Sequence, residues 1–200
     1  MNTQAHRYFI VNKPFGMVSQ FVSVEDVPLL GDLGFDFPEG THAVGRLDGL
    51  SEGLLILTTN KQVTRLLFDT ETPHRRTYLV RVNGLITPEK VKQLCSGVTI
   101  RIRGAGEYRT APCEVQLLDT PPDVLPFQLE QNPYISHSWL QVSLYEGKRH
   151  QIRSMMRAVQ HHCRRLIRIS IEDLKLGNLA TGEVKEIQEE EFFRLLKVVV

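Results

Sequence analysis

The chain has 200 residues, of which 42% are hydrophobic and 24% charged, a composition that indicates a folded globular protein and excludes a disordered chain. Its three cysteines are scattered, which argues against a disulfide framework, and no apolar run approaches the roughly 20 residues of a membrane span. The sequence therefore predicts a soluble cytoplasmic protein with one domain over residues 1–200, and its net charge of +1 does not in itself indicate a polyanionic partner.

The first half of the chain predicts strands at residues 8–11, 53–58 and 76–82, each an apolar or alternating run. A helix is expected after Asn60, which can cap it, because apolar residues recur there at helical spacing: Val63, Leu66 and Leu67. Thr87-Pro88 predicts the start of a second helix, with the threonine as cap, and Gly97 predicts its end.

The second half predicts strands at residues 113–118, 139–145 and 166–174, a surface loop at 121–132 and a closing helix at 189–197. The clearest helix is 149–160, whose apolar residues follow helical spacing: Ile152, Met155, Met156 and Val159. A second stripe of that helix carries guanidinium groups: Arg149, Arg153 and Arg157. The pattern as a whole predicts an α+β fold.

Charge is segregated along the chain although the total is close to zero. Residues 147–168 contain no acidic residue and carry these basic ones: Lys148, Arg149, Arg153, Arg157, Arg164, Arg165 and Arg168. Acidic residues gather near the end of the chain: Glu183, Glu186, Glu189, Glu190 and Glu191. A basic region of this kind is typical of a surface that binds a polyanion.

Two segments could carry chemistry. Within residues 42–60, Asp48 lies beside Gly49 just before the apolar strand, so a rigid strand could hold its carboxylate at the edge of a cleft. Taken alone, the pattern favours an ordinary turn residue at Asp48 and a surface charge at Arg46, because Asp is a common turn former. Residues 146–155 are strongly basic, and they could bind phosphate or form a solvated helix face.

Four motifs follow one another along the chain: Asn12-Lys13-Pro14 with Gly16, Gly45-Arg46-Leu47-Asp48 with residues 51–55, Glu146-Gly147-Lys148 with residues 150–153, and residues 176–179 with Gly182-Glu183. Together with Arg76-Thr77-Tyr78, they resemble the RNA pseudouridine synthases, in the branch of small enzymes that modify ribosomal RNA. The resemblance runs over residues 8–187. Residues 138–140 and 166–168 are similar to the large-subunit type, which has no S4-like RNA-binding domain.

The resemblance implies the catalytic fold of that family, a mixed and mostly antiparallel sheet in two lobes around a cleft. It implies isomerisation of a uridine in large-subunit (23S) ribosomal RNA, or in a pre-ribosomal particle, without a cofactor. No metal is expected, and nothing in the sequence demands more than a monomer. Asp48 takes the place of the essential carboxylate, either as a nucleophile or as a base towards the ribose. The residues leave that choice open.

The motif match also implies roles for other residues. Tyr78 corresponds to the aromatic residue that packs on the flipped uracil, and Arg153 to the cation that pairs with the catalytic carboxylate. Arg46 is expected to hold the RNA backbone, and phosphate contacts are expected from Lys148, Arg149 and Arg157. Leu166 is expected to line the apolar wall of the pocket. Tyr78 and Leu166 could also be ordinary core residues.

Other hypotheses rest on fewer residues. Cys113 after Pro112 lacks the second cysteine of a zinc deaminase, and His161-His162-Cys163 lacks a distant partner motif for a metal.

Two nucleotide-binding motifs are also incomplete. Gly104 and Gly106 lack the third glycine of a dinucleotide loop, and Gly147-Lys148 lacks the preceding glycine of a P-loop. A non-catalytic RNA-binding or ribosome-assembly factor would show the same basic region, and a synthase could act on 16S ribosomal RNA or transfer RNA.

Overall fold

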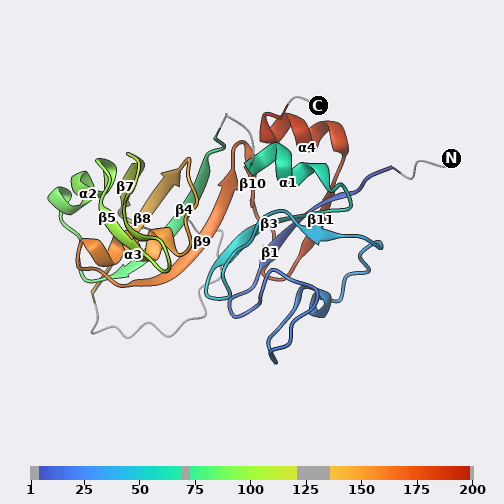
Figure 1. Cartoon of the computed structure of the whole chain (residues 1–200), viewed down its shortest axis with the longest axis horizontal. Helices are drawn as coiled ribbons and strands as arrows, with labels where there is room; N and C mark the ends of the chain where they lie inside the picture. The colour runs from blue at the N-terminus through green and yellow to red at the C-terminus, as the bar shows by residue number, and fades with distance from the viewer. Residues whose placement is uncertain (1–4, 69–72, 121–135, 199–200) are drawn as a thin grey trace. The chain divides into compact units, whose positions relative to one another are not determined.

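The computed structural model describes residues 5–68, 73–120 and 136–198 (Figure 1), so the loop expected at 121–132 lies outside the described residues. The chain forms two compact units. The first unit consists of Met1–His74 and Arg168–Val200, and the second of Arg75–Ile167. Strand β9, Cys163–Ile171, carries the chain from the second unit back to the first. The expected single domain over residues 1–200 stays a prediction.

The first unit is built on strands in the order β11-β1-β3-β9, with β1 antiparallel to both of its neighbours. The two inner strands of this order are β1, Tyr8–Lys13, and β3, Glu52–Thr58, and the edge strand β11 is Val184–Ile187. Two short strands extend this unit: β2, His42–Ala43, beside β3, and β10, Leu174–Lys175, beside β9. Every residue of β1 and β3 is buried, as expected of strands covered on both faces.

One face of β1 packs against helix α4, Glu189–Leu196 (Figure 1). The ring of Tyr8 lies 4.6 Å from the ring of Phe192 on that helix. The Tyr8 hydroxyl accepts a 3.0 Å hydrogen bond from Asn60, whose side-chain oxygen accepts from the first backbone N–H of helix α1, Gln62–Phe68. Asn60 therefore caps α1, as the sequence predicted, and also ties that cap to the sheet.

The other face of β1 packs against the long segment that follows it, because adjacent residues of a strand point to opposite faces. Phe9 lies 5.6 Å from Phe35 and 5.7 Å from Phe37, both in edge-to-face contact. This segment also contains a short 3-10 helix, Leu30–Leu33. Its aromatic cluster explains how a segment with little regular structure covers a sheet.

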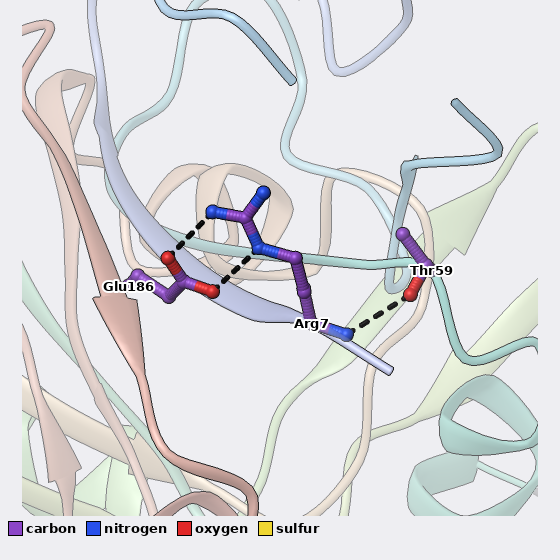
Figure 2. A network of polar contacts seen from close by, with 3 residues as sticks. All are labelled: Arg7, Thr59 and Glu186. Carbon is purple, nitrogen blue, oxygen red and sulfur yellow. Dashed lines mark hydrogen bonds and ion pairs between the residues drawn. The ribbon is translucent and has the colours of Figure 1, made fainter. Parts of the chain in front are cut away.

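Arg7, immediately before β1, contacts Glu186 of β11 and Thr59, which directly follows β3 (Figure 2). Its guanidinium donates two 2.7 Å hydrogen bonds to the carboxylate of Glu186 on β11, and its backbone N–H donates to the Thr59 hydroxyl at 3.0 Å. The bond from Arg7 holds the pKa of Glu186 below its usual range. Because this ion pair is exposed to solvent, we assign it to strand register rather than to stability.

The second unit is built on strands in the order β9-β4-β8-β7, with β8 antiparallel to both of its neighbours. Strand β4 is Arg76–Asn83, β7 is Glu114–Leu118 and β8 is His137–Leu144. A separate hairpin is formed by β5, Thr99–Ile102, and β6, Gly106–Arg109. Helix α2, Pro88–Cys95, packs against β7, and helix α3, Gln151–Ala158, packs against β5.

The apolar side of α3 enters the core of the second unit. All four residues that the helical spacing selected are buried there: Ile152, Met155, Met156 and Val159. They share this core with strand residues of β4 and β8, among them Val80, Val82, Leu140 and Val142. The apolar face predicted for this helix is therefore confirmed.

The expected α+β class with mostly antiparallel strands is confirmed, and so are the predicted ends of α2. The Thr87 hydroxyl accepts from the Lys90 N–H at 3.5 Å. Gly97 has a φ of +83°, and a Cβ there would lie 2.2 Å from the Thr110 carbonyl oxygen, so no other residue fits. Within the described ranges, no helix is long and apolar enough to cross a bilayer.

Helix α3 is shorter than the expected 149–160, and the predicted stripe of three arginines is wrong. His150 has a φ of +54°, a left-handed conformation that a helix cannot contain, so α3 begins at Gln151. Arg149 therefore lies before the helix, and only Arg153 and Arg157 lie on it. At the other end, Gln160 has a φ of +64° and the helix has already stopped at Ala158.

Other element bounds also differ from the expected ones. Strand β9 begins at residue 163 instead of 166 and ends at 171 instead of 174, because Glu172, with a φ of +47°, starts a turn into β10. Strand β1 continues through Lys13, two residues further than expected. The sequence patterns did not indicate the short strands β2, β5, β6 and β11, which depend on their pairing partners rather than on apolar runs.

Candidate active site

Asp48 lies in the first unit, on the loop between β2 and β3. Arg46 and Asp48 are exposed, whereas Leu47 between them is buried. This alternation is typical of an extended segment, in which side chains two residues apart leave the backbone on the same side. The loop therefore exposes a guanidinium and a carboxylate two residues apart.

Two segments fix the backbone around Asp48. The Ser19 hydroxyl donates to the Leu47 carbonyl at 2.9 Å and accepts from the Leu47 N–H at 3.0 Å. On the other flank, the Gly16 N–H donates to the Gly49 carbonyl at 2.8 Å. Although the Asp48 side chain is exposed, its backbone is held on both sides, which is the rigid support that a catalytic group requires.

Gly45 begins the loop in a conformation that favours glycine. Its φ is +70°, and a Cβ at this position would lie 2.7 Å from the ring of Phe68 at the end of α1. The ring of Phe68 at the end of α1 therefore lies directly against the backbone just before Arg46. A side chain at position 45 would have to displace either that ring or the loop.

Lys13, the last residue of β1, is fully buried within the same unit. Its ammonium donates to the carbonyl oxygens of Pro14 at 2.8 Å and Met17 at 2.6 Å. Burial lowers the pKa of Lys13 to about 8, while the negative charges of Glu52 and Asp48 act in the opposite direction. Asp48 therefore has a buried cation near it in its own unit.

Arg168 on β9 is a second buried cation of the first unit, only 4% exposed. Its Nε donates to the Leu54 carbonyl at 2.8 Å. Its Nη2 is buried and finds no hydrogen-bond partner in the part of the chain that the structure describes. The charge of Arg168 also lowers the pKa of Lys13, so the two cations are electrostatically coupled.

Replacing Lys13 with Met should change how stability depends on pH. The pKa of Lys13 is about 8 in the native protein against an ordinary value of 10.5, so between these values the unfolded chain holds a proton that the native protein has released. The free energy of unfolding of the wild type, relative to the variant, therefore rises with pH in this window, by about 2 kcal/mol between about pH 8 and pH 10.

Urea unfolding of both proteins at these two pH values would measure this difference. Burial raises the pKa of the Cys113 thiol to about 12 and that of Cys163 to about 11, and these contributions are common to both proteins. A difference that stays constant with pH would show that Lys13 keeps its ordinary pKa.

Tyr78 lies in the second unit, on β4 opposite Val142 of β8. Its side chain is half-buried and packs against the core of that unit. An aromatic ring with one side on a rigid core and an accessible remainder is suited to stacking on a base. Leu166 on β9 is buried inside the same core, and its expected place in a pocket wall stays a prediction.

Four basic residues of the second unit that the motifs singled out lie on α3 or on the loop before it. Arg153 is partly buried and its Nη1 donates to the Cys163 carbonyl at 3.1 Å, whereas Arg157 is exposed. Lys148 and Arg149 are exposed on the loop before the helix. Asp48 and Arg153 belong to different units, so the ion pair expected between them stays a prediction.

The structure gives ordinary roles to the residues behind the metal hypotheses. The Cys113 thiol donates to the Leu94 carbonyl at 3.3 Å. The His161 ring forms two hydrogen bonds: its Nδ1 lies 2.7 Å from the Asn83 carbonyl oxygen, and its Nε2 lies 3.3 Å from the Lys90 ammonium nitrogen. No group of three or more metal-ligating side chains occurs among the residues that the structure describes.

Two supporting residues were not identified from the sequence. Ser19 carries no local signal, because its partner Leu47 is 28 residues away. The charge pattern places Arg168 among the basic residues of an exposed surface, but the structure shows that it is buried. Its position inside an apolar strand was the available signal, since a charged residue in such a strand must be buried with partners or functional.

The chain is similar to proteins of known families. A sequence model described as RNA pseudouridylate synthase matches residues 7–158. The chain is 33% identical over 173 residues to the ribosomal large subunit pseudouridine synthase E of Xanthomonas axonopodis pv. citri (strain 306), covering 86% of this chain and 88% of the relative. It is 30% identical over 194 residues to the protein of the same name from Vibrio parahaemolyticus serotype O3:K6 (strain RIMD 2210633), covering 94% and 76%.

Solved structures share the fold. A structure described as a pseudouridylate synthase matches with a TM-score of 0.77 and 25% identity, covering 98% of this chain and 76% of the other. A chain of a Cbf5-Nop10-Gar1 complex matches with a TM-score of 0.57 and 15% identity, covering 87% and 51%, and at that identity it shows the fold alone. The resemblance that the sequence motifs indicated, including the large-subunit type, is confirmed by these relatives.

Proposed function

The chain belongs to the RNA pseudouridylate synthase family, and we propose that its substrate is a uridine in the RNA of the large ribosomal subunit. The names of two relatives support this choice of RNA. In the reaction, the bond from the ribose to N1 of uracil breaks and a bond to C5 forms. C5 loses a proton and N1 gains one, so nothing is added, and we propose that the protein needs neither cofactor nor metal.

The observation that carries the proposal is the support of Asp48. Its backbone is held by Ser19 through Leu47 and by Gly16 through Gly49. Breaking a glycosidic bond requires a carboxylate beside the sugar, either as a nucleophile or as a base that removes a ribose proton. We assign this role to Asp48. We assign to Arg153 the role of the cation that pairs with this carboxylate.

A uridine stacked in RNA is out of reach of a carboxylate, so it must leave the stack before it reacts, at a cost of a few kcal/mol. We assign to Tyr78 the stacking contact with the flipped uracil, because its ring is half-buried on a rigid strand. Leu166 is assigned to the apolar wall beside it. Arg46, which is exposed two residues before Asp48, is assigned to the RNA backbone.

The activity can be tested with purified protein and an unmodified transcript of large-subunit ribosomal RNA, in the presence of a chelator. Carbodiimide-blocked primer extension maps any pseudouridine, with Asp48→Asn as control. One new stop with the wild type alone would establish the activity and the target. The absence of a stop, followed by stops on 16S ribosomal RNA or transfer RNA, would overturn the choice of RNA. No activity on any of them would favour a non-catalytic assembly factor.

Phosphate contacts are assigned to Lys148, Arg149 and Arg157, which are all exposed in the second unit. Replacing both Arg149 and Arg157 with Ala should weaken RNA binding and reduce the slope of log K against log salt by about 1 to 2, because fewer counterions are released. Filter binding across a salt series measures this slope. Arg194→Ala, an exposed change on α4, is the control. An unchanged slope in the double variant would contradict the assignment.

We further propose that the protein acts in the cytoplasm as a monomer. Sedimentation of the purified protein at the concentration used for the RNA assay measures its mass. A dimer at that concentration would contradict the second part of this proposal.

A further inference from the structure

Glu146 is an acidic residue immediately before the proposed phosphate contacts, where its charge opposes the binding of RNA. It lies between β8 and α3, one residue before Gly147. Counting charges alone, this carboxylate should repel a phosphate held by Lys148 or Arg149. Its contacts in the structure indicate why a carboxylate occupies this position.

The carboxylate of Glu146 accepts hydrogen bonds from three different segments of the second unit. The Tyr108 hydroxyl on β6 donates to Oε2. The Ala111 backbone N–H donates to Oε1 at 2.9 Å, and the Gln151 side-chain amide donates to Oε1 at 2.5 Å. The bond to Glu146 raises the pKa of Tyr108, so the hydroxyl stays a donor. Glu146 thus links the β5–β6 hairpin, the segment after it and the first residue of α3.

Gln151 passes this restraint to the basic loop. Its side chain is 4% exposed, and because its amide nitrogen donates to Glu146, its oxygen is turned towards the loop. That oxygen accepts from the Lys148 N–H at 2.8 Å, and the Gln151 N–H donates to the Lys148 carbonyl at 3.1 Å. Both backbone groups of Lys148 are therefore held, and the left-handed turn at His150 completes the loop.

Tyr108 restrains the Lys148 side chain as well. The ammonium of Lys148 lies over the Tyr108 ring, 5.0 Å from its centroid. The hydroxyl of that ring is itself bound by Glu146. A cation held over an aromatic ring loses fewer rotamers when it binds a phosphate, which lowers the entropic cost of the contact.

We infer that Glu146 is a positioning residue for RNA binding, which acts through Gln151 and Tyr108 to hold Lys148 and Arg149 in the conformation that contacts phosphate. The inference rests on the proposed function, because it assumes that these two residues contact the RNA. Glu146 then increases affinity for a polyanion although its own charge opposes binding. The sign of the effect of removing that charge therefore separates positioning from direct electrostatics.

The first comparison is between Glu146→Gln and Glu107→Gln, which each remove one negative charge from the second unit. Glu107 is exposed on β6, next to Tyr108, and its side chain makes no hydrogen bond or ion pair with a described residue. Filter binding to the unmodified large-subunit transcript should show about tenfold weaker binding for Glu146→Gln, and unchanged or slightly tighter binding for Glu107→Gln. Equal affinities of the two variants would overturn the inference.

The second comparison exchanges the two polar partners. The double variant Glu146→Gln with Gln151→Glu places a carboxylate at position 151, which can accept from both the Lys148 N–H and the amide at position 146. It carries one more negative charge than Glu146→Gln, so charge alone predicts weaker binding. Positioning predicts that the double variant recovers most of the lost affinity. Further weakening in the double variant would overturn the inference.

The kinetic constants of Glu146→Gln separate a role in binding from a role in the chemical step, and two further variants test the contacts of Tyr108 and Lys148. Glu146→Gln should raise KM while kcat stays within about twofold, because only binding geometry is disturbed. A loss of kcat with unchanged KM would overturn the inference.

Tyr108→Phe keeps the aromatic ring but removes the hydroxyl that binds Glu146, so it should weaken RNA binding less than Glu146→Gln does. Lys148→Ala tests the premise: wild-type affinity in that variant would overturn the phosphate contact itself, and the inference with it.

Discussion

The Asp48→Asn variant should lose isomerisation by at least about a thousandfold while its affinity for RNA stays within a few fold. The amide has nearly the same shape as the carboxylate but can neither attack the sugar nor remove a proton. Because the side chain is exposed and the loop is held through the backbone of Leu47 and Gly49, folding should not change. Single-turnover kinetics and filter binding on the same transcript would separate the two effects.

The matched control for this variant is Asp26→Asn, an exposed carboxylate of the first unit in the segment before the 3-10 helix. It should keep wild-type activity and affinity. Residual turnover of Asp48→Asn within tenfold of the wild type would show that another group supplies the essential carboxylate. A parallel loss of RNA affinity would indicate that Asp48 acts in binding.

The Gly45→Ala variant should impair catalysis although it removes no functional group. Its Cβ would lie 2.7 Å from the Phe68 ring, and the φ of +70° adds a backbone cost of about 1–2 kcal/mol. Either the ring or the loop must move, and a shift of about 1 Å at a catalytic group can cost a hundredfold in rate. We expect kcat to fall by about that factor while thermal unfolding still shows a cooperative transition.

Combining this change with Phe68→Ala tests the cause. The double variant removes the collision but keeps the backbone cost, so it should recover part of the lost rate, while Phe68→Ala alone should have a small effect because that side chain is 40% exposed. Wild-type kcat in Gly45→Ala would contradict the view that the loop before Asp48 is tightly constrained.

Much of the candidate site could be proposed from the sequence because its residues stand in short, contiguous motifs. Residues 45–48 could be identified as one motif, and the buried strand after them was evident from its apolar run. Helical periodicity correctly selected the four core residues of α3. These signals are local, so they can be recognised without knowing which distant residues the segments contact.

The errors have a common physical origin. The helical pattern of α3 extends through Arg149, but the backbone at His150 is left-handed, held by the bonds between Lys148 and Gln151. Periodicity describes which residues face a core and carries no information about such a turn. The strands β5 and β6 were missed for the same reason, since short polar strands form only where a partner satisfies their backbone groups.

The sequence by itself determined the family, the reaction and the candidate carboxylate, because these depend on which residues stand together in a motif. The tertiary structure decided which residues support them. Ser19 lies 28 residues from Leu47, and Tyr108 lies 38 residues from Glu146, so only folding brings each pair together. It also decided that Lys13 and Arg168 are buried cations rather than surface charges. Burial and hydrogen bonding join residues that are distant in the chain, and no local pattern encodes them.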